Sequence, residues 1–225
     1  MTAAVDATAF AHDERAELAE LLGGLTPEQW NAPTLCSEWR VRDVVAHMFS
    51  YEDVGMGALI GRFVAGGLNA DRMNAAAVAR FANHSTDDLL ERVRQYLDPS
   101  GLTAKFGGRI ALTDGMVHQQ DIRRPLGLPR EIPAERLLCA LPFACTARPL
   151  GARRRIDGLS FTTTDLDWST GTGTGPVIEG PAEAVLMAIA GRRESLTELI
   201  GPGKPLLAER ISAEHRADPR RAQSG

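Results

Sequence analysis

Three polar residues on one predicted helix are the first feature of this sequence that could do chemistry. In the stretch ALTDGMVHQQDIRRPLGLP, Asp114 and His118 lie four positions apart and Asp121 follows three positions later. Spacings of four and three place side chains above one another on a helix. Ile110 and Val117 share this stripe, so it combines apolar and polar groups. Buried polar groups need partners, which here would be another helix, water or a metal ion.

An acid and a histidine one helical turn apart can bind a metal ion together. Asp114 and His118 have this spacing, and the alternative is a surface pair worth only ~0.2–0.5 kcal/mol. Helical bundles commonly complete metal sites from a facing helix. Two histidines and one carboxylate would leave a position open, as in catalytic zinc sites, where the ion lowers the pKa of a bound water or thiol. Asp121 would then hydrogen-bond the ligand His118, or else pair with Arg123 or Arg124.

A second histidine and two neighbouring residues lie near another predicted helix. His47, in RVRDVVAHMFSYED, sits at the edge of an apolar face, where it would be either a hydrogen-bonded core residue or a ligand. Cys36 precedes this helix in a loop without the basic or helix-start context that activates a thiol. Trp39, in the same loop, would pack the loop on the helices or form a wall of a ligand pocket.

The composition limits the class of protein. The chain has 225 residues, 44% of them hydrophobic, and a formal net charge of −4. It can therefore bury a large core, but it lacks a general positive field for nucleic acid. No apolar run approaches the ~20 residues that span a bilayer, and the first residues do not resemble a signal peptide. Three cysteines without a CxxC motif fit a reducing cytoplasm. We expect a cytoplasmic protein with no nucleic-acid or membrane partner.

Helical periodicity dominates the first two thirds of the chain. It predicts helices near residues 7–22, 41–65, 70–82, 85–97, 108–124 and 133–147. After Gly151 the sequence is rich in threonine and predicts two short strands, followed by a helix over 181–200. The predicted fold class is α+β, mainly α. A helical bundle would occupy residues 7–150, a small α/β domain 151–201 and a flexible tail 202–225.

Two motifs together resemble the mycothiol-dependent maleylpyruvate isomerase family, a branch of the DinB-like superfamily. They are TLCSEWRVRDVVAHM and, further along the chain, DGMVHQQDIRRPLGLP. The segment LDWSTGTGTGPVIEGPAEAVLMAIAGR is similar to the second domain of that family. The resemblance implies a DinB-like four-helix bundle, a divalent metal, usually zinc, and mycothiol as a thiol cosubstrate. By position, the implied metal ligands are His47, Asp114 and His118, with Asp121 behind them.

The resemblance also implies a type of reaction. Members of the family activate the mycothiol sulfur for addition to an electrophile, either as S-transferases or as cis–trans isomerases of an unsaturated diacid. No catalytic residue beyond the metal site is implied. The family usually has Glu where this chain has Asp114, so Asp121 remains an alternative carboxylate ligand. Arg72 and Arg80 would either bind carboxylates of the thiol or the small electrophilic substrate or lie on the surface. Trp39 is the third candidate contact for these ligands.

Two other interpretations of the sequence remain open. The bundle could be a non-catalytic, metal-stabilised module that binds a small molecule or a partner. It could also be a metal-free bundle whose polar residues bond to one another. A monomer and a homodimer are both compatible with the sequence.

Overall fold

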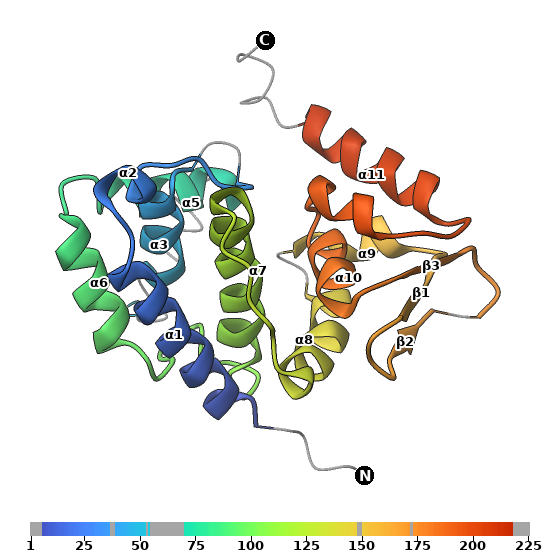
Figure 1. Cartoon of the computed structure of the whole chain (residues 1–225), viewed down its shortest axis with the longest axis horizontal. Coiled ribbons are helices and arrows are strands. Elements are labelled where there is room, and N and C mark those ends of the chain that lie inside the picture. Colours follow the sequence, from blue (N-terminus) through green and yellow to red (C-terminus); the bar gives the residue numbers. More distant parts are fainter. Residues whose placement is uncertain are drawn as a thin grey trace. The chain divides into compact units, whose positions relative to one another are not determined.

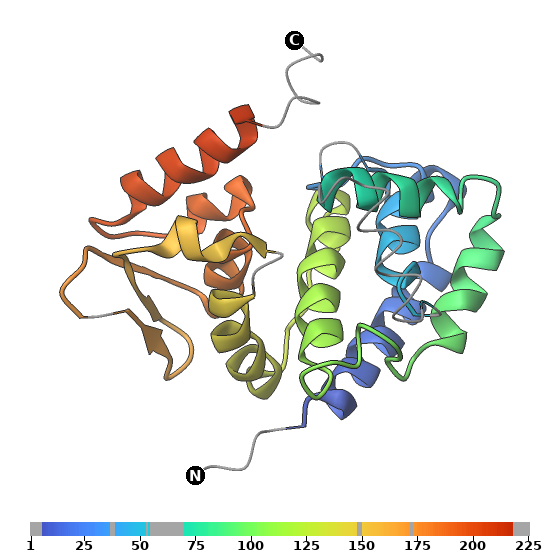
Figure 2. The same ribbon diagram turned by 180° about the vertical axis from the view of Figure 1, so that it is seen from behind.

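The computed structural model describes residues 6–36, 39–52, 54, 70–147, 150–171 and 173–217. The chain divides into two compact units, Met1–Glu131 and Ile132–Gly225 (Figures 1 and 2). The boundary expected near residue 150 is therefore too late. Helix α8 (Ala134–Thr146) belongs to the second unit because it packs against α10 of that unit. The sequence could not show this, since a helical period does not reveal which core a helix joins.

The first unit is built around a closed ring of helices. Within the ring, α1 packs against α6 and α7, and α3 packs against the same two helices. The four are α1 (Thr8–Gly23), α3 (Val41–Phe49), α6 (Thr86–Gln95) and α7 (Arg109–Leu126). This is the expected four-helix bundle. Two further helices, α2 (Pro27–Trp30) and α5 (Ala70–Ala79), pack against α3 (Figure 1).

Apolar residues from all four helices of the ring meet in one core. Leu18 of α1, Val44 of α3, Leu89 of α6 and Ile122 of α7 are each almost fully buried in it. Each of these residues is buried where the four helices pack against one another. The core therefore fixes the distance between α3 and α7, the two helices that carry the candidate ligands.

Helix α3 ends earlier than its hydrophobic pattern predicts. The pattern extends to residue 65, but the helix ends at Phe49 and a turn follows; residues 53 and 55–69 lie outside the described part of the chain. In this turn the Ser50 hydroxyl donates to the carbonyl of His47 at 2.8 Å. The Glu52 side chain is buried and lies 2.7 Å from Arg15. These polar contacts favour the turn, and a contact between residues distant in sequence cannot be read from periodicity.

The second unit combines helices with a small sheet. The strand order is β2-β1-β3; β1 pairs antiparallel with β2 and parallel with β3. Helix α10 packs against β1, β3, α8 and α9, and all of its residues except Glu183 are buried. The elements after α8 are α9 (Ala152–Ile156), β1 (Ser160–Thr163), β2 (Ser169–Thr170), β3 (Val177–Gly180), α10 (Ala182–Ile189), the 3-10 helix η2 (Arg193–Glu198) and α11 (Lys204–Ala217). The mainly helical α+β fold class is therefore confirmed.

Two predictions for the second unit are wrong in detail. The helix expected over 181–200 ends at Ile189, whose carbonyl accepts a hydrogen bond from the buried Arg155 guanidinium. The tail expected to be flexible from residue 202 contains α11, which buries Leu207 and Ile211 and packs against α9 and η2. An apolar pair four positions apart is enough to dock this otherwise polar helix. Among the described residues, none of the helices is both long enough and apolar enough to span a bilayer.

Candidate metal centre

Two helices of the first unit bring three ligand-type side chains together. His47 comes from α3, and Asp114 and His118 come from the facing α7. Their ligand atoms all lie within 4.8 Å of one another. The His118 Nε2 atom is 3.5 Å from Asp114 Oδ1, and the centroids of the two imidazole rings are 5.1 Å apart. The i, i+4 spacing on α7 and the α3–α7 contact therefore produce a compact set of two nitrogen donors and one oxygen donor.

The two ring nitrogens of His118 have different surroundings. Nε2 faces Asp114, while Nδ1 lies 2.9 Å from Asp121 Oδ2. The Asp121 side chain is fully buried, whereas Asp114 is partly exposed. A histidine that binds a metal through one nitrogen usually donates the other N–H to a carboxylate, which fixes the tautomer and the ring orientation. The distances thus separate the two acids, with Asp114 among the ligand-type groups and Asp121 on the opposite side of the ring.

The same neighbours shift the proton affinity of His118. Burial would lower the pKa of this imidazole, but the charge of Asp114 and the hydrogen bonds with Asp121 and Cys36 outweigh burial and raise the pKa to about 10. Without a metal ion, the acids therefore hold His118 in its protonated form at neutral pH. A metal ion and this proton would compete for the same side chain, because a metal ligand must be neutral.

Cys36 is a neighbour of the site, although the sequence showed only that its loop offers no activating context for a thiol. Its Sγ atom lies 3.1 Å from Asp121 Oδ2 and 3.8 Å from His118 Nδ1. These three residues form a second group with ligand-type atoms within 4.8 Å. A nucleophilic Cys–His–Asp triad needs the thiol and the acid on opposite ring nitrogens, whereas here both face Nδ1. No local signal could have revealed this contact, because 85 positions separate Cys36 from Asp121.

Aromatic rings flank His47 on two sides. The Trp39 ring centroid lies 4.7 Å from that of His47, and the Tyr51 ring meets it edge-on at 5.9 Å. The Tyr51 hydroxyl is 2.7 Å from Asn74 Oδ1 on α5. Trp39 thus lies beside the site, as its sequence position allowed. The spacing of four places Tyr51 beside His47 on the predicted helix, but the sequence assigned Tyr51 no role at the site.

The two arginines expected to contact thiol or substrate are both exposed. Arg72 lies in α5 and Arg80 directly follows this helix. Exposed arginines can reach a ligand or simply remain in solvent, so their role stays a prediction.

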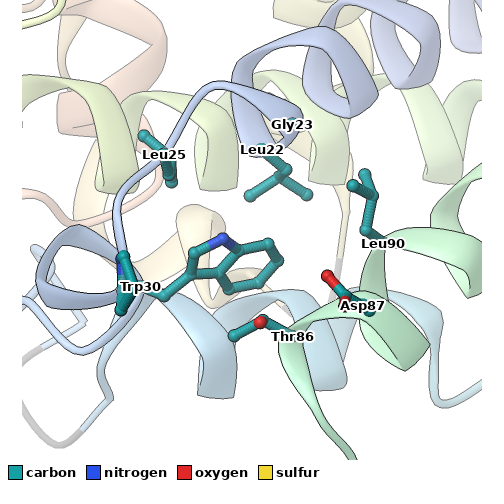
Figure 3. Close-up of a pocket in the computed structure, with 8 residues that line it drawn as sticks. Leu22, Gly23, Leu25, Trp30, Thr86, Asp87 and Leu90 are labelled. Atoms are coloured by element: carbon teal, nitrogen blue, oxygen red, sulfur yellow. The ribbon is translucent and has the colours of Figure 1, made fainter.

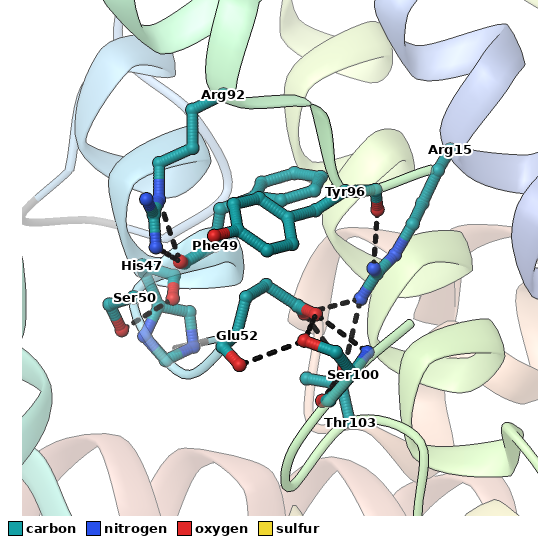
Figure 4. A network of polar contacts seen from close by, with 9 residues as sticks. All are labelled: Arg15, His47, Phe49, Ser50, Glu52, Arg92, Tyr96, Ser100 and Thr103. Atoms are coloured by element: carbon teal, nitrogen blue, oxygen red, sulfur yellow. Dashed lines mark hydrogen bonds and ion pairs between the residues drawn. The ribbon is translucent and has the colours of Figure 1, made fainter. Parts of the chain in front are cut away.

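A buried polar network holds the C-terminal end of α3 just after His47. The Arg15 guanidinium lies 2.7 Å from Glu52 Oε1, which also accepts a hydrogen bond from the Thr103 hydroxyl (Figure 4). From α6, the Arg92 guanidinium donates two hydrogen bonds to the Phe49 carbonyl. Carbonyls at a helix end have no partner within the helix, so such donors stabilise the end. The network therefore fixes the helix turn that carries His47.

A pocket of about 200 Å³ lies elsewhere in the first unit (Figure 3). Residues of α1, α2 and α6 line it, among them Leu22, Trp30 and Asp87. None of the ligand-type residues described above belongs to its lining, so it is separate from the candidate metal centre.

A comparison with protein families identifies the domain that contains His47. Residues 11–101 match the family model described as the mycothiol maleylpyruvate isomerase N-terminal domain. This segment of the chain is similar to that domain. The match to the mycothiol maleylpyruvate isomerase N-terminal domain includes Cys36, Trp39 and His47 and stops before α7, so it does not cover Asp114 and His118. Neither the search of curated proteins nor the search of solved structures found a match.

Proposed function

We propose that this protein is a metal-dependent enzyme that uses mycothiol as a thiol cosubstrate. It would add the thiol sulfur to a small electrophile, keeping the C–S bond in the product as an S-transferase, or breaking it again by elimination after rotation as a cis–trans isomerase. The observation that carries this proposal is the approach of His47, Asp114 and His118 within 4.8 Å of one another. The match of residues 11–101 to a mycothiol maleylpyruvate isomerase domain supports the choice of thiol.

The chemistry of the donor set fits a divalent cation, with zinc as the proposed metal. Zinc in catalytic sites binds three protein ligands, commonly histidine nitrogens and a carboxylate, and keeps one position for water or substrate. His47, Asp114 and His118 provide this combination. When bound there, zinc would lower the pKa of a coordinated thiol and so provide a strong nucleophile at neutral pH.

The residues of the chain would orient this chemistry. Asp121 would hold the proton of His118 on Nδ1, which leaves Nε2 free to act as a ligand. The partly exposed Asp114 marks the side of the cluster that is open to solvent. Trp39 and Tyr51 would limit the approach of substrate around His47. Arg72 and Arg80 remain proposed contacts for carboxylates of the thiol or the electrophile.

The proposed partners are a low-molecular-weight thiol and a small electrophile, and the proposed location is the cytoplasm. Cys36, Cys139 and Cys145 are all free thiols in the structure. A reducing compartment keeps such thiols free.

Thiol conjugation by the zinc-loaded protein tests the proposal. Purified protein is mixed with mycothiol and a panel of electrophiles that includes monochlorobimane and an unsaturated cis-diacid. We expect conjugation or isomerisation above the metal-free control, and its loss in His47→Ala and His118→Gln. His84→Ala is the matched control, because the His84 side chain is exposed and contacts Phe81. Zinc binding without turnover on any electrophile would instead favour a binding module, and absence of zinc binding would favour a metal-free bundle.

A further inference from the structure

One carboxylate oxygen of Asp121 serves two neighbours at once. Oδ2 lies 2.9 Å from His118 Nδ1 and 3.1 Å from Cys36 Sγ. A carboxylate only accepts hydrogen bonds, so the Cys36 thiol is the donor in this contact. The Asp121 side chain is fully buried, where a carboxylate depends on such donors for its orientation. The thiol is therefore part of what holds the acid in place behind His118.

The loop before α3 presents Cys36 at this point through backbone contacts. The Leu35 amide donates to the Asp121 carbonyl at 3.1 Å, which attaches the loop to α7 beside Cys36. The Thr34 hydroxyl is 3.1 Å from the Cys36 amide and donates to the carbonyl of Trp39 at 2.8 Å. The loop is thus tied both to α7 and to itself, so the position of the thiol is set by the fold.

Other roles for Cys36 agree less well with these contacts. As a nucleophile it would need His118 to accept its proton, but it lies on the ring nitrogen that already faces Asp121. As a metal ligand together with His118 and Asp121 it would use Nδ1, on the side of the ring away from Asp114 and its contact with Nε2. A hydrogen-bonding role for Cys36 accounts for its 3.1 Å contact with Asp121 and keeps the Nε2 atom of His118 available as a metal ligand.

We propose that Cys36 is a positioning residue of the metal centre. Its thiol holds the Asp121 carboxylate, which in turn fixes the His118 ring so that Nε2 points toward Asp114 and His47. This inference rests on the metal site proposed above, and it adds a residue that acts on the metal through two others. Cys36 also connects the loop before α3, which carries Trp39, with the proposed ligand His118 on α7, because Cys36 and His118 both contact Asp121.

Zinc affinity in a competition titration with a chromogenic chelator tests this role. Partners that orient metal-binding histidines typically change metal affinity ~10–100-fold when they are removed. Because Cys36 acts one contact further away, we expect Cys36→Ala to weaken zinc binding at the lower end of that range, about tenfold. Cys36→Ser keeps an O–H donor for Asp121 and should stay within about threefold of the wild type. Cys139→Ala, another half-buried cysteine but on α8 of the second unit, is the matched control and should leave the affinity unchanged.

A nitrogen NMR spectrum of the zinc-loaded protein separates positioning from a general structural effect. The His118 ring should carry its proton on Nδ1 in the wild type and in Cys36→Ser, and this Nδ1–H signal should exchange faster with water in Cys36→Ala. The cobalt-substituted protein should lack a thiolate-to-metal absorption band in the near ultraviolet, because sulfur is not a ligand.

The outcomes separate a failure of the positioning role from a failure of the metal site itself. Wild-type or tighter zinc binding by Cys36→Ala overturns the positioning role. Failure of Cys36→Ser to restore the affinity also overturns it, since the loss would then follow from shape and not from the donor. A thiolate band that disappears in Cys36→Ser would make Cys36 a ligand and equally overturn it. If the wild type binds neither zinc nor cobalt, the proposed function fails as well, which distinguishes that failure from the other three.

Discussion

At the residue scale, two aspartates on the same helix face have different surroundings. Asp114 is partly exposed and lies near Nε2 of His118, while Asp121 is buried against Nδ1. The sequence left open which acid is the ligand, because both fall on one stripe of the helix. The positions of the two ring nitrogens favour Asp114, since a single imidazole cannot present both nitrogens to one ion.

Substitutions at Asp114 test this division. We expect Asp114→Asn to weaken zinc binding by more than about tenfold, because a neutral amide replaces a charged ligand in a set of three. Asp114→Glu keeps the charge and should lose less, although its side chain is one methylene longer. The chelator titration measures both, with the exposed Asp98→Asn as a control. Wild-type affinity in Asp114→Asn would show that Asp114 is not a ligand.

The pKa of His118 makes a separate prediction for the same site. This pKa is raised from 6.5 to about 10, so the metal-free protein holds His118 protonated at pH 8. The interaction of protonated His118 with Asp114 and Asp121 stabilises the fold fully below about pH 6.5. This contribution is lost as the pH rises through the raised pKa of about 10. Zinc requires the neutral imidazole, so binding at pH 8 should release close to one proton.

Calorimetric titration with zinc in two buffers of different ionisation enthalpy measures that proton. We expect the apparent binding enthalpy to change with the buffer by an amount equal to about one released proton per zinc ion. The His118→Gln variant should lose this dependence together with most of its affinity. Identical enthalpies for the wild type in both buffers would show that His118 is neutral before zinc binds.

At the element scale, regular patterns were predictable and long-range contacts were not. The stripe on α7 follows from spacing alone, because 3.6 residues complete a turn wherever the helix packs. The end of α3 could not be predicted in the same way. It depends on Glu52 meeting Arg15 of α1, 37 positions away. Cys36 entered the site for a similar reason, through a loop that is attached to α7 by the Leu35 amide.

A glycine at the start of α7 packs against α1, and substitutions of this glycine test how much that contact stabilises the first unit. Gly108 has φ +78, and an added Cβ would lie 2.8 Å from backbone atoms of Thr8. Gly127, at the other end of α7, has φ +65 with open space around it. Gly127→Ala should cost only the ~1–2 kcal/mol of a left-handed backbone. Gly108→Ala should cost ~1–3 kcal/mol more, because the backbones must move apart.

Urea unfolding of the two glycine variants measures this difference as a change in the free energy of unfolding. Because both substitutions add the same methyl group at positive φ, their difference isolates the contact between α7 and α1. Equal losses in the two variants would mean that this contact does not position α7.

At the scale of the whole molecule, the three residues of the candidate metal centre belong to the first unit. His47, Asp114 and His118 lie before residue 131, where the chain divides. The sequence correctly indicated a helical part followed by a smaller α/β part. It placed the boundary too late because α8 has the same helical period as the helices before it, and only packing against α10 assigns it to the second unit. It also missed α11, whose apolar residues are few.

Hydrogen exchange with and without zinc tests whether the metal site is confined to the first unit. Zinc bound at the proposed site would stabilise only the folded state, so the amides it protects should be those of the elements that supply ligands. We expect slower exchange in α3 and α7 and unchanged exchange in α10 and α11. Protection of the second unit equal to that of α7 would show that the site extends beyond the first unit.

The most direct measurement of the central claim is zinc X-ray absorption on the loaded wild-type protein, together with its zinc content. The account predicts one zinc per chain, surrounded by nitrogen and oxygen at ~2.0–2.2 Å, with the outer-shell pattern of two imidazoles. Sulfur at the ~2.3 Å typical of a zinc–thiolate bond would contradict it, because that would place the ion at Cys36 and not between His47, Asp114 and His118. A zinc content far below one per chain would contradict it as well.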